Sequence, residues 1–170
     1  MPIHLETHLR AQRATGRKLL VPYVTGGLLN WKEAIRAAVA SGADAIEVGI
    51  PFSDPVMDGP VIQEASLRAL KDGATPLGIV QEISTLDIDI PIAVMLYYNT
   101  LFRAGHERFA TSLVKNGVSA AIVPDLPLEE AREWCRDADA AGVETIMLAA
   151  PTAPDSRLPL VVERARGFVY

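Results

Sequence analysis

The chain of 170 residues is 49% hydrophobic and 22% charged, with a formal net charge of -5 at pH 7. This composition is typical of one globular domain, and the acidic balance argues against a nucleic-acid-binding protein, which needs a basic surface. No apolar run reaches the roughly 18–20 residues that span a bilayer, the start of the chain is too polar for a secretory signal, and the single cysteine, Cys135, excludes an internal disulfide. We therefore expect a cytoplasmic protein.

Apolar runs and helical stripes alternate along the chain. A short polar helix is expected over residues 3–17, then a strand over 19–27 that ends in two glycines. Asn30 is expected to cap the next helix, which ends at Gly42. Further strands are expected over 45–52, 91–98, 119–125 and 145–150, helices over 60–72, 76–85, 106–116, 128–141 and 155–166, and the start of a sixth strand at 168–170.

This alternation, with strands that are apolar on both faces, predicts a parallel sheet covered by helices. A doubly wound open sheet and a (β/α)8 barrel both fit. The open sheet usually carries a glycine-rich phosphate turn after its first strand, and this sequence has no such motif. In the second strand Ala45, Glu47 and Gly49 share one face and branched residues share the other, which favours the crowded interior of a TIM barrel.

A complete barrel has eight strand–helix units and typically about 250 residues. Residues 1–170 supply five units and the start of strand six. An open six-strand curl would leave unpaired edges and an uncovered inner face. We therefore expect a single, partial TIM-barrel domain that belongs to a longer chain.

Glu47 is the residue that the pattern singles out. A lone carboxylate within a strand covered on both sides must be paired with an Arg or Lys, protonated, or functional. Asp58 lies on the loop that leaves the same strand, where barrel enzymes place their chemistry, although Asp-Gly is equally a turn signal. The residues alone therefore predict proton transfer by two carboxylates, without a metal or a nucleotide.

Other polar and aromatic residues allow two interpretations. Tyr97 and Tyr170 could line a pocket or belong to the core, and Asp125, at the end of the fourth strand, is similarly placed. Asp54 fits a turn or an interface. Cys135 falls on the apolar face of a helix and is expected to be an inert core thiol.

The stretch EVGIPFSDPVMDGPVIQ, residues 47–63, resembles the signature of the tryptophan synthase alpha chain family. PYVTGG, MLYYNTLF, VPDLPLEE and GFVY resemble further patterns of that family, so the resemblance extends along the whole chain. The match is specific because more than a dozen signature positions follow in order.

The resemblance implies a barrel lyase that cleaves indole-3-glycerol phosphate to indole and glyceraldehyde 3-phosphate, a retro-aldol step of tryptophan biosynthesis. Glu47 would handle the proton at the indole ring carbon, and Asp58, expected to be exposed and ionised, would bind the indole N–H. Residues Tyr23, Tyr97 and Tyr170 would bind substrate. Loop 53–60 would face a beta chain, which carries pyridoxal phosphate in an alpha2beta2 heterotetramer; the alpha chain itself would use no cofactor.

Two departures from the family pattern qualify this expectation. Met57 replaces the usual Ala before the loop Asp-Gly, and we expect the role of Asp58 to survive. The region that would hold the substrate phosphate lies outside these 170 residues, so we expect little or no catalysis from them alone. Alternatives are a stand-alone lyase without a beta partner, a catalytically inactive barrel fragment, and another phosphate-sugar barrel such as an isomerase or an aldolase. An aldolase would prefer a Schiff-base lysine at a strand end, and these strands contain no lysine.

Overall fold

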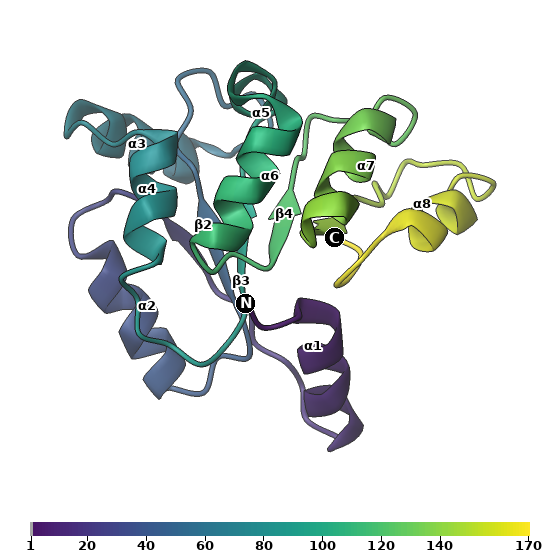
Figure 1. Cartoon of the computed structure of the whole chain (residues 1–170), viewed down its shortest axis with the longest axis horizontal. Coiled ribbons are helices and arrows are strands. Elements are labelled where there is room, and N and C mark those ends of the chain that lie inside the picture. The colour runs from purple at the N-terminus through teal and green to yellow at the C-terminus, as the bar shows by residue number, and fades with distance from the viewer. Residues whose placement is uncertain (1) are drawn as a thin grey trace.

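A computed structural model describes residues 2–170 of the chain (Figure 1). Five parallel strands form one sheet in the order β1-β2-β3-β4-β5. They are β1 (Tyr23–Thr25), β2 (Ile46–Gly49), β3 (Ile92–Met95), β4 (Ala120–Ile122) and β5 (Glu144–Ile146). A parallel bridge between Met147 and Val169 adds the start of a sixth strand. Each strand lies beside its predecessor, which is the order of a barrel wall, so the predicted partial (β/α)8 barrel is confirmed.

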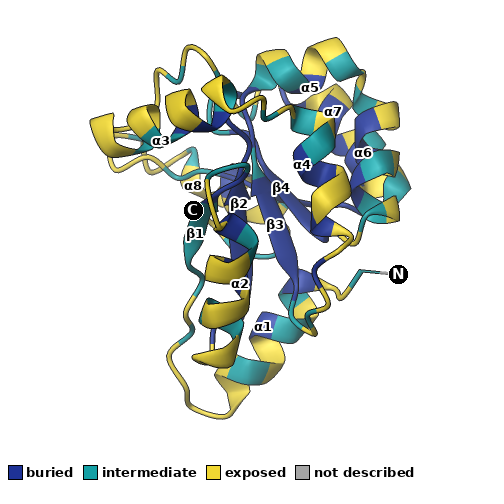
Figure 2. Cartoon of the chain, turned by 90° about the vertical axis from the view of Figure 1, so that its left-hand side faces the viewer, coloured by how far each residue is buried: buried dark blue, intermediate teal, exposed yellow. Residues whose placement is uncertain are grey.

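The helices are α1 (Leu5–Ala14), α2 (Trp31–Ala40), α3 (Pro60–Lys71), α4 (Pro76–Ile83), α5 (Tyr98–Ala104), α6 (His106–Lys115), α7 (Arg132–Ala141) and α8 (Leu158–Arg164). Helix α1 precedes the first strand, and the other helices follow the strands in chain order. Among the described residues, none of these helices has the length and apolar character that a bilayer crossing requires. Figure 2 shows buried strands under helices whose outer surfaces are exposed.

The two faces of the sheet differ as the alternation of residues predicts. Branched residues such as Ile46 and Val48 point outward into a large core with the helices, and Cys135 is buried in this core. The small residues Ala45, Ala93 and Ala120 point inward and contact Leu5 and Leu9 of α1. The space inside the wall is therefore filled by a helix at the amino ends of the strands.

One helix, α5, was not predicted, because the sequence analysis extended the strand before it to residue 98. The chain instead turns into a helix at Tyr98, whose backbone N–H donates to Asp125 Oδ1 at 2.8 Å. Asp125 follows β4, so its carboxylate joins the loops after two neighbouring strands. Its side chain thus stabilises an amino-terminal helix turn, which is a structural role.

One expected cap and one expected helix start were wrong. Asn30 occupies the N-cap position of α2, as expected, but it has a left-handed backbone with φ of 61° and makes no capping hydrogen bond through its side chain. Helix α7 begins at Arg132 rather than near residue 128, and Glu129, which precedes it, pairs with Arg157 at 2.8 Å. Both differences depend on contacts with distant or irregular backbone that local patterns do not encode.

Gly27 should be intolerant of any side chain. It follows β1 with φ of +80°, and an added Cβ would lie 2.6 Å from Ala74 Cβ. We expect Gly27→Ala to lower the free energy of unfolding by about 1–3 kcal/mol more than Gly42→Ala does. Gly42 is the matched control because its φ of +93° is similar but no atom lies within 4 Å of an added Cβ. Urea denaturation of both variants measures the difference, and equal losses would contradict the close contact.

Candidate active site

Glu47 occupies the middle of β2 on its inward face. Its strand neighbours in register are Tyr23 and Ala93. Its side chain is only 3% exposed, and Oε1 is buried without a hydrogen-bond partner among residues 2–170. Burial raises the pKa of Glu47 from 4.5 to about 7. The arrangement fits a carboxyl group that holds a proton near neutral pH and does not fit a structural ion pair with Arg or Lys.

The hydroxyl group of Tyr23 lies over Gly49, next to Glu47. A Cβ added at Gly49 would lie 1.8 Å from Tyr23 Oη, so glycine is required where the ring crosses β2. Burial raises the pKa of Tyr23 to about 12, and the nearby Asp58 and Glu47 carboxylates add to this rise. Tyr23 is therefore a neutral phenol beside both acids.

The loop after β2 carries Asp58 and is anchored by Tyr97 from the neighbouring strand. The Met57 backbone N–H donates to Tyr97 Oη at 2.9 Å, and the Tyr97 ring stacks on Phe52 with 5.0 Å between ring centroids. The Tyr97 hydroxyl also hydrogen-bonds the Asp58 carboxylate. The sequence-based expectation that Asp58 is exposed was wrong, because this anchoring leaves it half-buried.

Burial and hydrogen bonding act in opposite directions on Asp58. Burial raises the pKa of this carboxyl, and the hydrogen bond from Tyr97 partly lowers it. Helix α3 begins immediately afterwards, with Pro60 at its first position. Asp58 thus lies on a loop that Tyr97 anchors, just before the amino terminus of α3.

Tyr170 completes the group of predicted site residues. Its pKa is raised by burial first and then by the charges of Glu47 and Asp58, although the residue is 52% exposed. The structure therefore brings together Glu47, Asp58, Tyr23, Tyr97 and Tyr170 from four segments of the chain. Asp54 lies outside this group, exposed on the loop, where it accepts a hydrogen bond from Ser53 Oγ at 2.5 Å.

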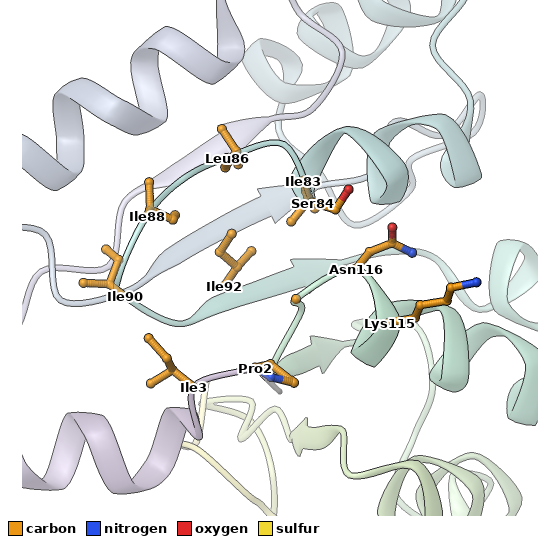
Figure 3. A pocket seen from close by; sticks show the side chains of 11 residues that line it. Pro2, Ile3, Ile83, Ser84, Leu86, Ile88, Ile90, Ile92, Lys115 and Asn116 are labelled. Atoms are coloured by element: carbon orange, nitrogen blue, oxygen red, sulfur yellow. The ribbon is translucent and has the colours of Figure 1, made fainter.

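A hollow at the opposite end of the sheet does not belong to this site. It has a volume of about 310 Å³ and is walled mainly by isoleucines near the amino end of β3, as Figure 3 shows. Its one charged lining residue is Lys115. A second hollow, of about 250 Å³, lies at the carboxyl ends of β4 and β5 and is lined by Met57, Asp125 and Leu148 among others. This second hollow adjoins the loop that carries Asp58.

In the described part of the chain, no group of three or more His, Cys, Asp or Glu side chains is placed to hold a metal ion. The acidic side chains of the site instead face tyrosine hydroxyls. The chemistry that this arrangement can perform is proton transfer and hydrogen bonding to a neutral ring.

A family model described as "Tryptophan synthase alpha chain" matches residues 9–170. The chain belongs to the tryptophan synthase alpha chain family. The curated alpha chain of Prochlorococcus marinus (strain MIT 9313) is 42% identical over 174 residues, and that of Thermobifida fusca (strain YX) is 43% identical over 170 residues. Each alignment covers 98% of this chain and 63% of the relative, so the chain spans less than two thirds of their length.

Solved structures of this family share the fold. The alpha subunit of Legionella pneumophila str. Paris has a TM-score of 0.90 and 34% identity, covering 98% of this chain and 66% of that one. Tryptophan synthase from M. tuberculosis, in its aminoacrylate- and BRD0059-bound form, has a TM-score of 0.90 and 36% identity, covering 100% of this chain and 70% of that one.

Gly49 is the site residue that the sequence analysis did not assign. Its only local signal was a small residue on the inward face of a strand, which is common in barrel interiors. The need for glycine depends on Tyr23, which comes from the neighbouring strand. That contact becomes visible only when the two strands are paired.

The raised pKa of Glu47 makes stability depend on pH. Below pH 4.5 the group is protonated in both states; between pH 4.5 and about 7 the unfolded chain ionises while the folded chain does not. Stability is therefore lost as pH rises through this window, by roughly 3 kcal/mol in total. We expect Glu47→Gln to escape the loss, so urea denaturation should show the variant gaining stability over the parent at pH 8 but not at pH 4.5.

Glu64→Gln on α3 is the control for this titration, because its side chain is 61% exposed. It should follow the parent across the whole pH range. A difference between Glu47→Gln and the parent that stays constant with pH would contradict the protonated state assigned to Glu47.

Proposed function

We propose that this chain is the catalytic wall of a lyase that cleaves indole-3-glycerol phosphate to indole and glyceraldehyde 3-phosphate. The observation that carries the proposal is Glu47, a buried carboxyl with no cation beside it in the described residues, on the strand that leads into the loop of Asp58. Membership of the tryptophan synthase alpha chain family supports the reaction class. The reaction needs a proton donor at a carbon atom, and a buried carboxylic acid with a pKa of about 7 suits that task.

Glu47 would act first as an acid and then as a base. It gives its proton to the indole ring carbon that carries the glycerol phosphate chain. The bond between that carbon and the chain then breaks, and the electron pair restores the aromatic ring. The hydroxyl of the departing chain becomes an aldehyde, and its proton returns to the Glu47 carboxylate, so the enzyme ends in its starting state.

Asp58 would stabilise the positive charge that develops on the indole nitrogen when the ring carbon is protonated. Its carboxylate accepts a hydrogen bond from the indole N–H, a contact that strengthens as the charge grows. Tyr97 anchors the loop by accepting a hydrogen bond from the Met57 backbone N–H, and it also restrains the Asp58 carboxylate. A fixed acceptor stabilises the transition state more than a mobile one because it needs no reorganisation.

The tyrosines would form the aromatic lining of the substrate site. Tyr23, Tyr97 and Tyr170 have raised pKa values, so they stay neutral while the carboxyl groups exchange protons. We propose that this chain uses no metal or cofactor of its own. Pyridoxal phosphate would belong to a partner beta chain, and no step assigned to this chain uses it.

The cleavage proposal is tested by measuring indole release from indole-3-glycerol phosphate. The assay compares this chain with a chimera that continues it with the remaining part of the Thermobifida fusca relative. We expect the chimera to be active and Glu47→Gln in it to lower kcat by about 10²–10⁴-fold, because general acid–base catalysis supplies that much. Glu64→Gln should have no effect.

Three outcomes would contradict parts of this assignment. Persisting release in Glu47→Gln would move the proton transfer to another residue. An inactive chimera with a folded barrel would support an inert scaffold and overturn the lyase. Unchanged activity in Asp58→Asn would remove Asp58 from the recognition of the indole N–H.

We further propose a beta chain as partner, in an alpha2beta2 assembly located in the cytoplasm. Large apolar side chains are exposed on the loops and helices that follow β2 and β3: Val56 is 79% exposed, Val61 77% and Phe102 65%. These elements lie at one end of the sheet, opposite α1, as Figure 2 shows. Exposed apolar side chains at one end of a molecule are a feature of protein interfaces.

The partner is tested with Phe102→Asp in the chimera. We expect this substitution to lower stimulation of indole release by a beta chain at least tenfold, because it places a charge in the apolar interface. Leu20→Asp is the matched control, since Leu20 is 54% exposed before β1, at the other end of the strands. Release that a beta chain never stimulates would favour a stand-alone lyase.

A further inference from the structure

A second buried carboxylate lies in the same row of the sheet as Glu47. The pairing of the strands places Glu47 beside Ala93, Ala93 beside Ala120, and Ala120 beside Glu144. Glu144 is 5% exposed and, like Glu47, belongs to the inward face. Two alanines therefore separate the two acids. Their small side chains leave room for another element to pack on the inner surface of the wall.

Helix α1 fills that space. Leu5 and Leu9 are 0% and 7% exposed and form one cluster with Ala45, Ala93 and Ala120. Ala45 precedes Glu47 by two residues and shares its face of β2. The leucines thus cover the apolar surface that adjoins Glu47 on the side facing the amino ends of the strands.

Glu144 holds the amino terminus of α1 against this surface. Its Oε2 accepts a hydrogen bond from Leu5 N at 2.5 Å, and its Oε1 accepts one from Glu6 N at 2.9 Å. These amides belong to the first turn of the helix, where no intrahelical acceptor is available and the helix dipole favours an anion. The carboxylate therefore serves as the cap that α1 lacks in its own sequence, since His4 makes no capping bond.

Two further bonds attach the same end of the helix. Ser119 Oγ donates to the Ile3 carbonyl at 2.6 Å, and Glu6 Oε2 accepts from Gly167 N at 3.2 Å. Leu5 also packs against Gly167, where an added Cβ would lie 2.9 Å from its Cδ2. Helix α1 is thus fastened to β4, β5 and the segment before the sixth strand.

We propose that α1 is a seal that keeps water from the inner wall beside Glu47, and that Glu144 is the positioning residue that holds the seal closed. This role deepens the proposed function and rests on it, because it matters for catalysis only if Glu47 is the proton donor. Glu144 touches neither substrate nor Glu47 and acts through the packing of Leu5 and Leu9.

Among the influences on the pKa of Glu47, the exclusion of water is the one that α1 can control. Tyr23 faces Glu47 from β1, Tyr170 from beyond β5 and Asp58 from the loop after β2, and none of these carries a positive charge. On α1, Glu6 pairs with Arg10, and His4 lies 3.3 Å from Glu144. The remaining charged side chains of the helix are His8, which is half-buried, and Arg13, which is exposed.

The experiment is a carboxyl ¹³C NMR titration of the whole 170-residue chain without substrate. The Glu47 signal is identified by its absence in Glu47→Gln. We expect Glu144→Gln, whose side chain has one acceptor oxygen instead of two, to lower the pKa of Glu47 by at least one unit. The amides of Leu5 and Glu6 should exchange with solvent at least tenfold faster.

Leu9→Ala tests the same proposal by a change that does not involve Glu144. It opens the seal while leaving the bonds of Glu144 in place, and it should also lower the pKa of Glu47. Arg13→Ala, on the exposed last turn of α1, is the matched control and should change nothing. If Glu144→Gln does not fold, Leu9→Ala decides the question.

Two results with Glu144→Gln would overturn the seal: α1 amides that exchange faster while the Glu47 titration stays unchanged, or α1 amides whose exchange does not change. An unchanged Glu47 titration in Leu9→Ala would also overturn it. The readout is independent of the cleavage assay. A shifted titration in an inactive enzyme would count against the proposed function alone, and an unshifted titration in an active enzyme would count against the seal alone.

Discussion

The structure depends on keeping an uncharged acid inside an apolar wall. Among residues 2–170 no cation lies near Glu47, so the folded chain holds it as a neutral carboxyl group, because ionisation carries a desolvation cost. The surrounding positions are accordingly small or phenolic: Ala45 and Gly49 on its own strand, and Ala93 and Tyr23 on the neighbouring strands. Larger side chains would crowd the site, and a positively charged one would lower the pKa of the acid and favour its ionised form.

The alternation of residues along the strands predicted the sheet, because successive side chains of a strand point to opposite faces. Residues such as Ile46 and Val48 meet helices, whereas Ala45 and Glu47 meet the interior, and strict alternation separates the two sets. The same alternation singled out Glu47 before any family pattern was considered. Helix α5 escaped this reasoning because Tyr97 and Tyr98 continue an apolar run, and the helix start depends on Asp125 from the following loop.

The environment of the site was less predictable than its members. Asp58 was recognisable from the loop sequence, but its half-buried state depends on Tyr97, which lies 40 residues beyond Met57 in the chain. Glu144 gave no signal, since an acid at the start of a short strand resembles many solvated ones. Its partners are backbone amides at the other end of the chain, and backbone donors leave no trace in residue identity.

The anchor of the Asp58 loop uses the main chain of residue 57 and leaves its side chain outside. Tyr97 bonds the backbone N–H of Met57, while the Met57 side chain remains 56% exposed. The position of the loop and the chemistry of its outer surface therefore depend on different atoms of residue 57. Another side chain at this position can change the outer surface of the loop without moving the carboxylate of Asp58 that follows it.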